Sequence, residues 1–116
     1  MIYKIISRTL WQQAVEAGCF SGAEIDLQDG FIHFSAAHQV QETAAKHFAN
    51  RDDLVLVAVD ENNLENDLRW EVSRGGDRFP HLYGKLNVAH AEWTTHLKLS
   101  GDGVPVIPDL DESSNS

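Results

Sequence analysis

An arginine and a glutamate stand two residues apart in a segment with the pattern of a β-strand. In Leu68-Arg69-Trp70-Glu71-Val72, apolar and charged side chains alternate. Because side chains along a strand point to opposite faces in turn, Arg69 and Glu71 share one face, and the other three face the core. The pair is either a surface ion pair or part of a site that binds and acts on a ligand. As a site, Arg69 holds an anion, and Glu71 accepts a hydrogen bond from a sugar hydroxyl or stabilises positive charge at a ribose carbon.

A histidine interrupts an apolar strand earlier in the chain. His33 lies between Ile32 and Phe34, so it either finds a hydrogen-bond partner within the fold or lines a cleft. In an extended backbone Ser35 points the same way as His33, so both side chains could reach one ligand. Ser35 is also predicted to cap the helix that follows, whose free N–H groups and dipole favour an anion.

The segment after Glu71 combines glycines with aromatic and polar side chains. Arg74-Gly75-Gly76 lets backbone N–H groups approach a phosphate, although the same sequence also makes a flexible loop. Its spacing is not that of a P-loop or a dinucleotide-binding motif. His81 and Tyr83 then mix ring faces with polar tips, as nucleobase pockets do, but such residues also fill ordinary cores.

Other catalytic patterns are missing from the sequence. The chain has six histidines, yet no His-Glu-x-x-His motif and no paired-cysteine spacing, so we predict no metal. Cys19 is the single cysteine and is expected to be an inert thiol. No Gly-x-Ser-x-Gly motif supports a serine nucleophile.

Charge is distributed unevenly over the 116 residues. Nine basic and eighteen acidic side chains give a net charge of −9, which repels polyanions, so we predict no nucleic-acid partner. Residues 69–85 hold four basic and two acidic side chains, whereas the rest of the chain holds five basic and sixteen acidic ones. This cationic segment suits a small anionic ligand, or it is a set of solvated loop charges.

The spacing of apolar residues predicts an α+β fold. We expect two N-terminal helices packed on a mostly antiparallel split sheet, with a loop over residues 20–30. One helix is capped by Thr9 and ended by Gly18, and the other spans 36–49. Strands are predicted over 2–6, 31–34, 54–59, 68–72, 82–86 and 88–99.

Length and composition predict a single domain over residues 1–100. An acidic, serine-rich tail over 101–116 is expected to be disordered. No apolar run is long enough to span a membrane, and the N-terminus lacks the pattern of a secretory signal. We therefore predict a cytoplasmic protein without a membrane partner, and the oligomeric state stays open.

Four short motifs run in order through the chain. They are Tyr3-Lys4-Ile5, Asp29-Gly30-Phe31-Ile32-His33-Phe34-Ser35, Arg69-Trp70-Glu71 and Phe79-Pro80-His81-Leu82-Tyr83-Gly84. In order and spacing, over about residues 2–100, they resemble the small bacterial domain-of-unknown-function family 952. The resemblance implies an ADP-ribosyltransferase-like fold, in which two small sheets form a cleft that holds NAD in active members.

The same resemblance implies roles for single residues. His33 resembles the histidine that contacts the ribose of NAD. Glu71 could stand for the catalytic glutamate, but in active members that residue comes later in the chain, so Glu92 is the other carboxylate to test. The RNA 2′-phosphotransferase branch of this fold has an Arg-His pair where this chain has Arg8-Thr9. That departure and the net charge argue against tRNA as a substrate.

Three functions are compatible with these residues. The leading hypothesis is a cleft that takes NAD as a substrate and breaks its N-glycosidic bond or transfers ADP-ribose. The alternatives are a non-catalytic module that binds a nucleotide or phosphate, and a protein-interaction domain without a small ligand. In the leading hypothesis Glu71 and His33 are catalytic, and the ligand-binding residues are Ser35, Arg69, Arg74, His81 and Tyr83.

Overall fold

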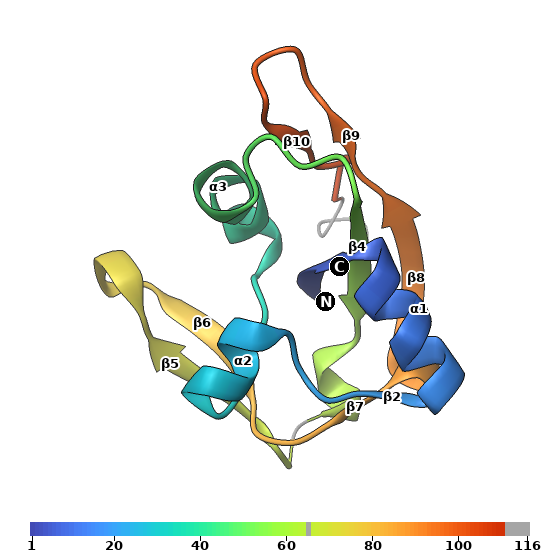
Figure 1. Ribbon diagram of the computed structural model, residues 1–116. Helices are drawn as coiled ribbons and strands as arrows, with labels where there is room; N and C mark the ends of the chain where they lie inside the picture. Colours follow the sequence, from blue (N-terminus) through green and yellow to red (C-terminus); the bar gives the residue numbers. More distant parts are fainter. Residues whose placement is uncertain (65, 111–116) are drawn as a thin grey trace.

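The computed structural model describes residues 1–64 and 66–110 and shows an α+β fold (Figure 1). Within these residues there are three α-helices and several small, antiparallel sheets. A three-stranded sheet forms one side of the molecule, and a hairpin arm forms the other (Figure 1). No helix in the described part of the chain is long and apolar enough to cross a membrane.

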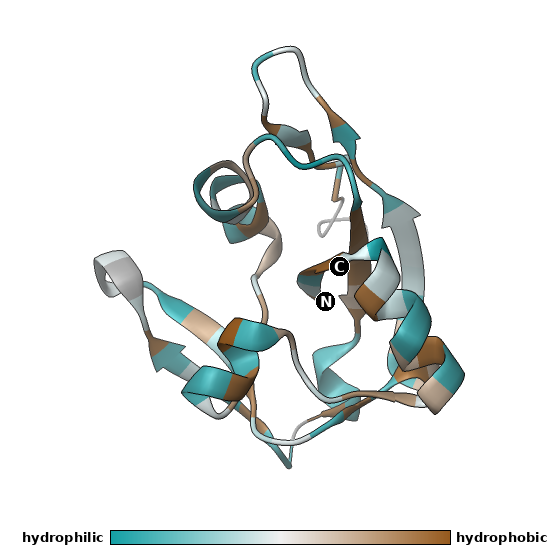
Figure 2. Ribbon diagram, viewed as in Figure 1, coloured by the Kyte–Doolittle hydropathy of each residue, from teal (hydrophilic) through white to brown (hydrophobic). Residues whose placement is uncertain are grey.

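The first sheet has the order β1-β4-β8, and all its strand pairs are antiparallel. Its centre is β4 (Leu54–Val59), whose six residues are all buried and apolar along their length (Figure 2). Side chains alternate along β4, so one face packs against α1 and the other against α3. The strand predicted over 54–59 is therefore confirmed, and it is covered on both faces. The flanking elements are β1 (Ile2–Ser7), β8 (Ala91–His96), α1 (Arg8–Ala17) and α3 (Ala37–His47).

The second sheet has the order β3-β6-β5 and carries most of the predicted site. Its strands are β3 (Ile32–His33), β6 (Arg78–Leu82) and β5 (Leu68–Val72). Ile32 and Leu82 are buried on its core face. The strand predicted over 82–86 is wrong, because β6 ends at Leu82 and the next strand starts at Leu86. The prediction that Trp70 and Val72 face the core is wrong, because they are 37% and 62% exposed. The β5–β6 hairpin extends away from the first sheet (Figure 1), so its far end is uncovered.

The remaining strands are short. Two small sheets pair β2 with β7 and β9 with β10. The segment predicted as one strand over 88–99 is divided, because a 3-10 turn precedes β8 and a break separates β8 from β9. These elements are β2 (Cys19–Phe20), β7 (Leu86–Asn87), β9 (Lys98–Leu99), β10 (Pro105–Val106), η1 (Glu61–Asn63), η2 (Arg74–Gly76) and η3 (Val88–His90).

A short helix replaces the loop predicted over residues 20–30. This helix, α2 (Glu24–Asp29), begins where the N–H of Ala23 donates to the Asp26 carboxylate at 2.8 Å. It ends at Gly30, whose φ of 88° is left-handed and whose N–H donates to the Asp26 carbonyl. Six residues are too few to show a helical repeat of apolar side chains, so the periodicity missed the helix.

The helix caps differ from the predicted ones. Ser7, not Thr9, caps α1, because its Oγ accepts the N–H of Leu10 at 3.2 Å. The predicted end at Gly18 is confirmed by its left-handed φ of 89°. Ser35 does not cap the following helix either, since α3 starts after Ala36 and the Ser35 hydroxyl bonds Thr43 Oγ1 at 3.2 Å.

The first ten residues of the predicted tail take part in the fold. Within 101–110, β10 pairs with β9, and the Pro105 carbonyl accepts a hydrogen bond from Gln41 of α3 at 3.2 Å. Ile107 and Leu110 pack against the α3 side of the core. The polar composition of residues 101–110 therefore belongs to an ordered hairpin and its continuation. Residues 111–116 lie outside the described part.

Two connections join the first sheet to the second. Tyr3 of β1 and Ser35 exchange two backbone hydrogen bonds of 2.8 Å. Lys4, only 6% exposed, reaches from β1 to Asp26 of α2, which is 2% exposed. The Lys4 Nζ lies 2.9 and 3.0 Å from the two Asp26 oxygens. A buried charge without a partner is costly, so this ion pair fixes α2 against β1.

We predict that the Lys4–Asp26 pair acts as a unit in folding. Lys4→Met should lower the free energy of unfolding by about 3 kcal/mol, because it leaves Asp26 charged and buried. In the double variant with Asp26→Asn, the loss should fall short of the sum of the single losses by more than about 1 kcal/mol. Urea unfolding of the four proteins measures this coupling.

The matched control is Lys46→Met, which removes an exposed ion pair with Glu42 on α3. It should leave the urea midpoint unchanged. Strictly additive losses at Lys4 and Asp26 would show that the two groups do not depend on each other.

Candidate functional site

The register of the second sheet brings the predicted site residues onto one face. His81 of β6 pairs directly with His33 of β3 on one side and with Arg69 of β5 on the other. Directly paired residues project to the same face, and so do residues two positions along a strand. Glu71 therefore joins Arg69, and ring contacts bring in two further aromatic side chains. We call this set of side chains the polar face; it consists of Phe31, His33, Arg69, Glu71, Tyr83 and the buried His81, which is 5% exposed.

Glu71 is held by two hydrogen bonds to the same carboxylate oxygen. Its Oε1 accepts the Tyr83 hydroxyl at 2.7 Å and lies 2.8 Å from His81 Nδ1. The hydrogen bond from Tyr83, followed by that from His81, holds the pKa of Glu71 below its usual range. The same contact raises the pKa of Tyr83. Glu71 is thus an ionised carboxylate in a fixed orientation, and its side chain remains 37% exposed.

A cation lies beside this carboxylate. The Arg69 guanidinium carbon is 5.3 Å from the centre of the Tyr83 ring, within the range of a cation–π contact. Arg69 is exposed, so its donors can reach a ligand at the surface. The polar face therefore offers one fixed negative group and one accessible positive group.

Aromatic rings form the rest of the face. Phe31 stacks on His81 with ring centres 4.0 Å apart and an interplanar angle of 23°. It also contacts His33 at 4.6 Å and Tyr83 at 5.3 Å. His33 and His81 meet edge to face at 5.5 Å. This packing restricts the two imidazole rings to defined orientations.

The buried carboxylate of Asp26 holds His33 in position. Its Oδ1 lies 2.6 Å from His33 Nδ1 and accepts the backbone N–H of His33 at 3.1 Å. Burial alone would raise the pKa of Asp26, but the His33 hydrogen bond, the Lys4 charge and the backbone donors together lower it to about 2. Burial lowers the pKa of Lys4, and Asp26 opposes that shift. The second ring nitrogen of His33 lies 3.0 Å from Asp29 Oδ2.

Some predicted residues do not reach the polar face. Ser35 is 6% exposed, and its hydroxyl bonds Thr43 instead of pointing along with His33. Glu92 is an exposed residue of β8 in the first sheet, away from the pairing partners of His33. Arg74 starts η2 at the end of the hairpin arm, and its side chain lies outside what the structure describes.

The two groups that support His33 were not predicted from the sequence. Lys4 is a lone charge within a buried apolar strand, and such a charge requires a partner. Asp26 is the N3 residue of α2 and accepts the N–H of Ala23, but an alanine at the N-cap lacks the Ser/Thr-x-x-Glu signature of a capping box. Lys4 and Asp26 are 22 residues apart, so no local sequence pattern indicates that they pair. Among residues 1–64 and 66–110, no three histidine, cysteine or acidic side chains converge on a point where a metal ion could bind.

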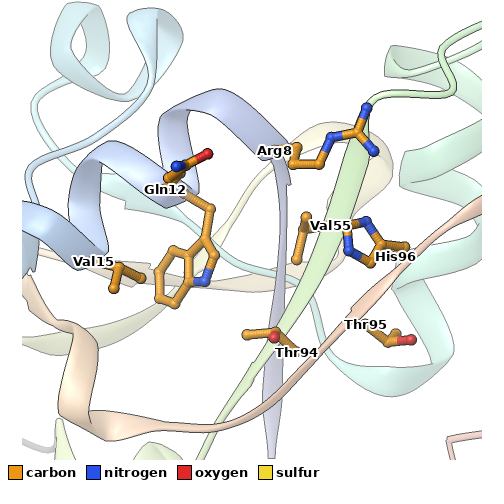
Figure 3. Close-up of a pocket in the computed structure, with 8 residues that line it drawn as sticks. Arg8, Gln12, Val15, Val55, Thr94, Thr95 and His96 are labelled. Atoms are coloured by element: carbon orange, nitrogen blue, oxygen red, sulfur yellow. The ribbon is translucent and has the colours of Figure 1, made fainter.

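A pocket lies on another part of the molecule (Figure 3). It has a volume of about 270 Å³ and lies between α1 and the β4–β8 side of the first sheet. None of the predicted site residues lines it. We call it the α1–β8 pocket; it is lined by Arg8, Trp11, Gln12, Val15, Val55, Thr94, Thr95 and His96.

Comparison with known families gives one match over most of the chain. Residues 5–94 match the model of the family described as protein of unknown function (DUF952). The chain belongs to the DUF952 family. This confirms the family resemblance carried by the four motifs. A search of curated proteins found no match.

Three solved structures of one protein are similar to this chain. The crystal structure of protein CC0527 from Caulobacter crescentus is 53% identical, with a TM-score of 0.89 over 90% of this chain and 92% of that chain. A double-mutant form of CC0527 is 52% identical, with a TM-score of 0.88 and the same coverage. Its solution NMR structure is 54% identical, with a TM-score of 0.82 over 90% of both chains. None of the three is named as an ADP-ribosyltransferase, so that part of the predicted fold stays a prediction.

We predict that Asp26 makes the protein sensitive to acid. Its folded pKa of about 2 is below the ordinary value of 3.8. The carboxylate therefore adds about 2 kcal/mol that is present above about pH 5 and is lost as the pH falls through about 2. Thermal unfolding of the DUF952 protein between these pH values should show a fall in stability that Asp26→Asn removes.

Asp29→Asn is the control for this measurement. Asp29 also faces His33, but it is 41% exposed, so the variant should retain the acid-dependent fall. An Asp26→Asn protein with the same pH slope as the wild type would contradict the assignment.

Proposed function

We propose that the polar face of this DUF952 protein binds a nicotinamide dinucleotide and breaks its N-glycosidic bond, transferring ADP-ribose to water or another acceptor. The observation that carries the proposal is the ionised Glu71 carboxylate, fixed on the same face as His33 and Arg69. A fixed carboxylate can stabilise positive charge as it develops in a transition state. The implied ADP-ribosyltransferase-like fold is part of the proposal.

In the proposed reaction, the bond between the ribose anomeric carbon and the nicotinamide nitrogen breaks first. Its electron pair leaves with the pyridinium ring, which becomes neutral nicotinamide. Positive charge develops on the anomeric carbon and the ring oxygen of the ribose, as in other glycosidic cleavages. Both donors to Glu71 bind Oε1, so we assign Oε2 to this charge. The oxygen of the acceptor then bonds to the anomeric carbon, and the acceptor proton passes to solvent.

Other residues of the polar face supply binding. The exposed Arg69 guanidinium pairs with a phosphate of the dinucleotide. His33, held by Asp26, contacts the ribose, and the exposed Tyr83 ring offers a stacking surface. Ser35 is left out of the proposal, because its hydroxyl is bonded to Thr43. The cationic character of residues 69–85 supports an anionic ligand.

A non-catalytic binding module is the second candidate. It is favoured by the two hydrogen bonds that Glu71 Oε1 accepts, from Tyr83 and His81. A carboxylate that holds these two side chains in place can have a purely structural role. The convergence of His33 and Arg69 on one face favours either nucleotide function over an interaction domain without a small ligand. The two candidates differ in turnover and not in binding.

We predict that Glu71→Gln separates binding from turnover. Wild-type protein mixed with NAD should release nicotinamide, and Glu71→Gln should reduce the rate at least about 100-fold, because it removes the charge that stabilises the transition state. ADP-ribose at a hundredfold excess over its dissociation constant should still stabilise this variant by roughly 2.7 kcal/mol. Chromatographic detection of nicotinamide and thermal-shift titration measure the two effects.

Two further variants complete the experiment. Arg69→Ala should abolish the thermal shift, since it removes the phosphate contact, whereas Glu92→Gln on the other sheet should behave as wild type. If the wild type binds but releases no nicotinamide, the protein is a non-catalytic binding module and the proposed reaction is rejected. The absence of any shift with NAD or ADP-ribose would reject both nucleotide functions.

A further inference from the structure

We propose that the α1–β8 pocket is a second ligand site, which binds a small organic carboxylate with an apolar body. The pocket is on the first sheet and shares no residue with the polar face. In Figure 3, side chains from α1, β4 and β8 surround it. Its volume of about 270 Å³ lies just below the usual range of about 300–1,000 Å³ for small-molecule pockets. A ligand with one ring or a short chain fits this size.

The floor of the pocket is apolar. Val55 of β4 is 5% exposed and belongs to the core on the α1 side of the sheet. Trp11 packs against the same core, and Val15, one turn further along α1, is 52% exposed. Burying an exposed valine and an indole face against an apolar ligand is favourable. The floor therefore selects the body of the ligand.

The polar rim of the pocket is cationic. None of its eight lining residues is acidic, although the chain has twice as many acidic as basic side chains. Arg8 makes no ion pair with any described residue. The nearby Asp53 is occupied by Arg51, which binds both of its oxygens at 2.8 and 3.0 Å. The Arg8 charge acts on Asp53, but no carboxylate of the described residues binds its guanidinium directly, so an anion at the pocket can reach it.

Further donors lie next to Arg8. His96 pairs with Val55 across β8 and β4, and both lie close to Arg8 in Figure 3. Thr94 lies on the same face of β8 as His96, and its hydroxyl can donate to a carboxylate. Donors at one end and an apolar floor at the other match an amphipathic anion better than an inorganic one. The geometry thus points to a carboxylate head at Arg8 and an apolar body over the floor.

Amide NMR of the isotope-labelled full chain, titrated with benzoate, tests the proposal. Saturable shifts are expected in α1 and β8. Benzyl alcohol, which keeps the ring and lacks the charge, and inorganic phosphate, which keeps the charge and lacks the ring, should each bind at least about tenfold more weakly. Shifts that never saturate, or phosphate binding as tight as benzoate binding, would overturn the proposal.

Arg8→Gln and Arg78→Gln form a matched pair of variants. Both remove an exposed arginine, but only Arg8 lines the pocket. Arg8→Gln should weaken benzoate binding about tenfold, and Arg78→Gln should leave it unchanged. Equal losses in the two variants would mean that general positive charge attracts the anion, and the proposal would be rejected. This outcome is independent of NAD binding at the polar face.

Discussion

The buried carboxylate of Asp26 is the interaction on which the arrangement of the molecule depends. It receives the Lys4 ammonium from β1, the Ala23 N–H at the start of α2, and both the backbone N–H and the ring of His33 from β3. A carboxylate out of contact with water is tolerated only when such donors surround it. Three segments are therefore tied to one group, and the imidazole that faces the surface is placed as a consequence.

The same alternation of side chains that builds the core also builds the candidate site. On β3 and β6, Ile32, Pro80 and Leu82 pack inward, and the residues between them, His33 and His81, belong to the polar face with Arg69 and Glu71 of β5. Two carboxylate–histidine pairs then lie next to each other, one supported from within by Asp26 and the other by Glu71 at the surface. Their different exposure separates their roles, since a buried carboxylate positions a ring and an accessible one can meet a ligand. The α1–β8 pocket, in contrast, forms where a helix covers a sheet incompletely.

Sequence patterns correctly predicted the side-chain directions that depend only on residue spacing within one strand. The common face of Arg69 and Glu71 follows from a two-residue repeat, and so does the side-chain direction of His33. The orientation of Trp70 and Val72 followed the same rule, but their burial depended on whether another element covers the hairpin, which no local pattern contains. The prediction that Ser35 points the same way as His33 is wrong for a related reason. The chain leaves β3 after His33, and the serine turns toward α3. The pairing of Lys4 with Asp26 exists only in the assembled fold.

We propose that the polar face, supported by Asp26, binds a nucleotide ligand. Amide NMR mapping of ADP-ribose binding on the full chain is the most direct test. Saturable shifts should gather at Phe31, His33, Arg69, Glu71, His81 and Tyr83 and spare Arg8 and His96. Shifts confined to the α1–β8 pocket, or no saturable shift anywhere on the second sheet, would contradict it.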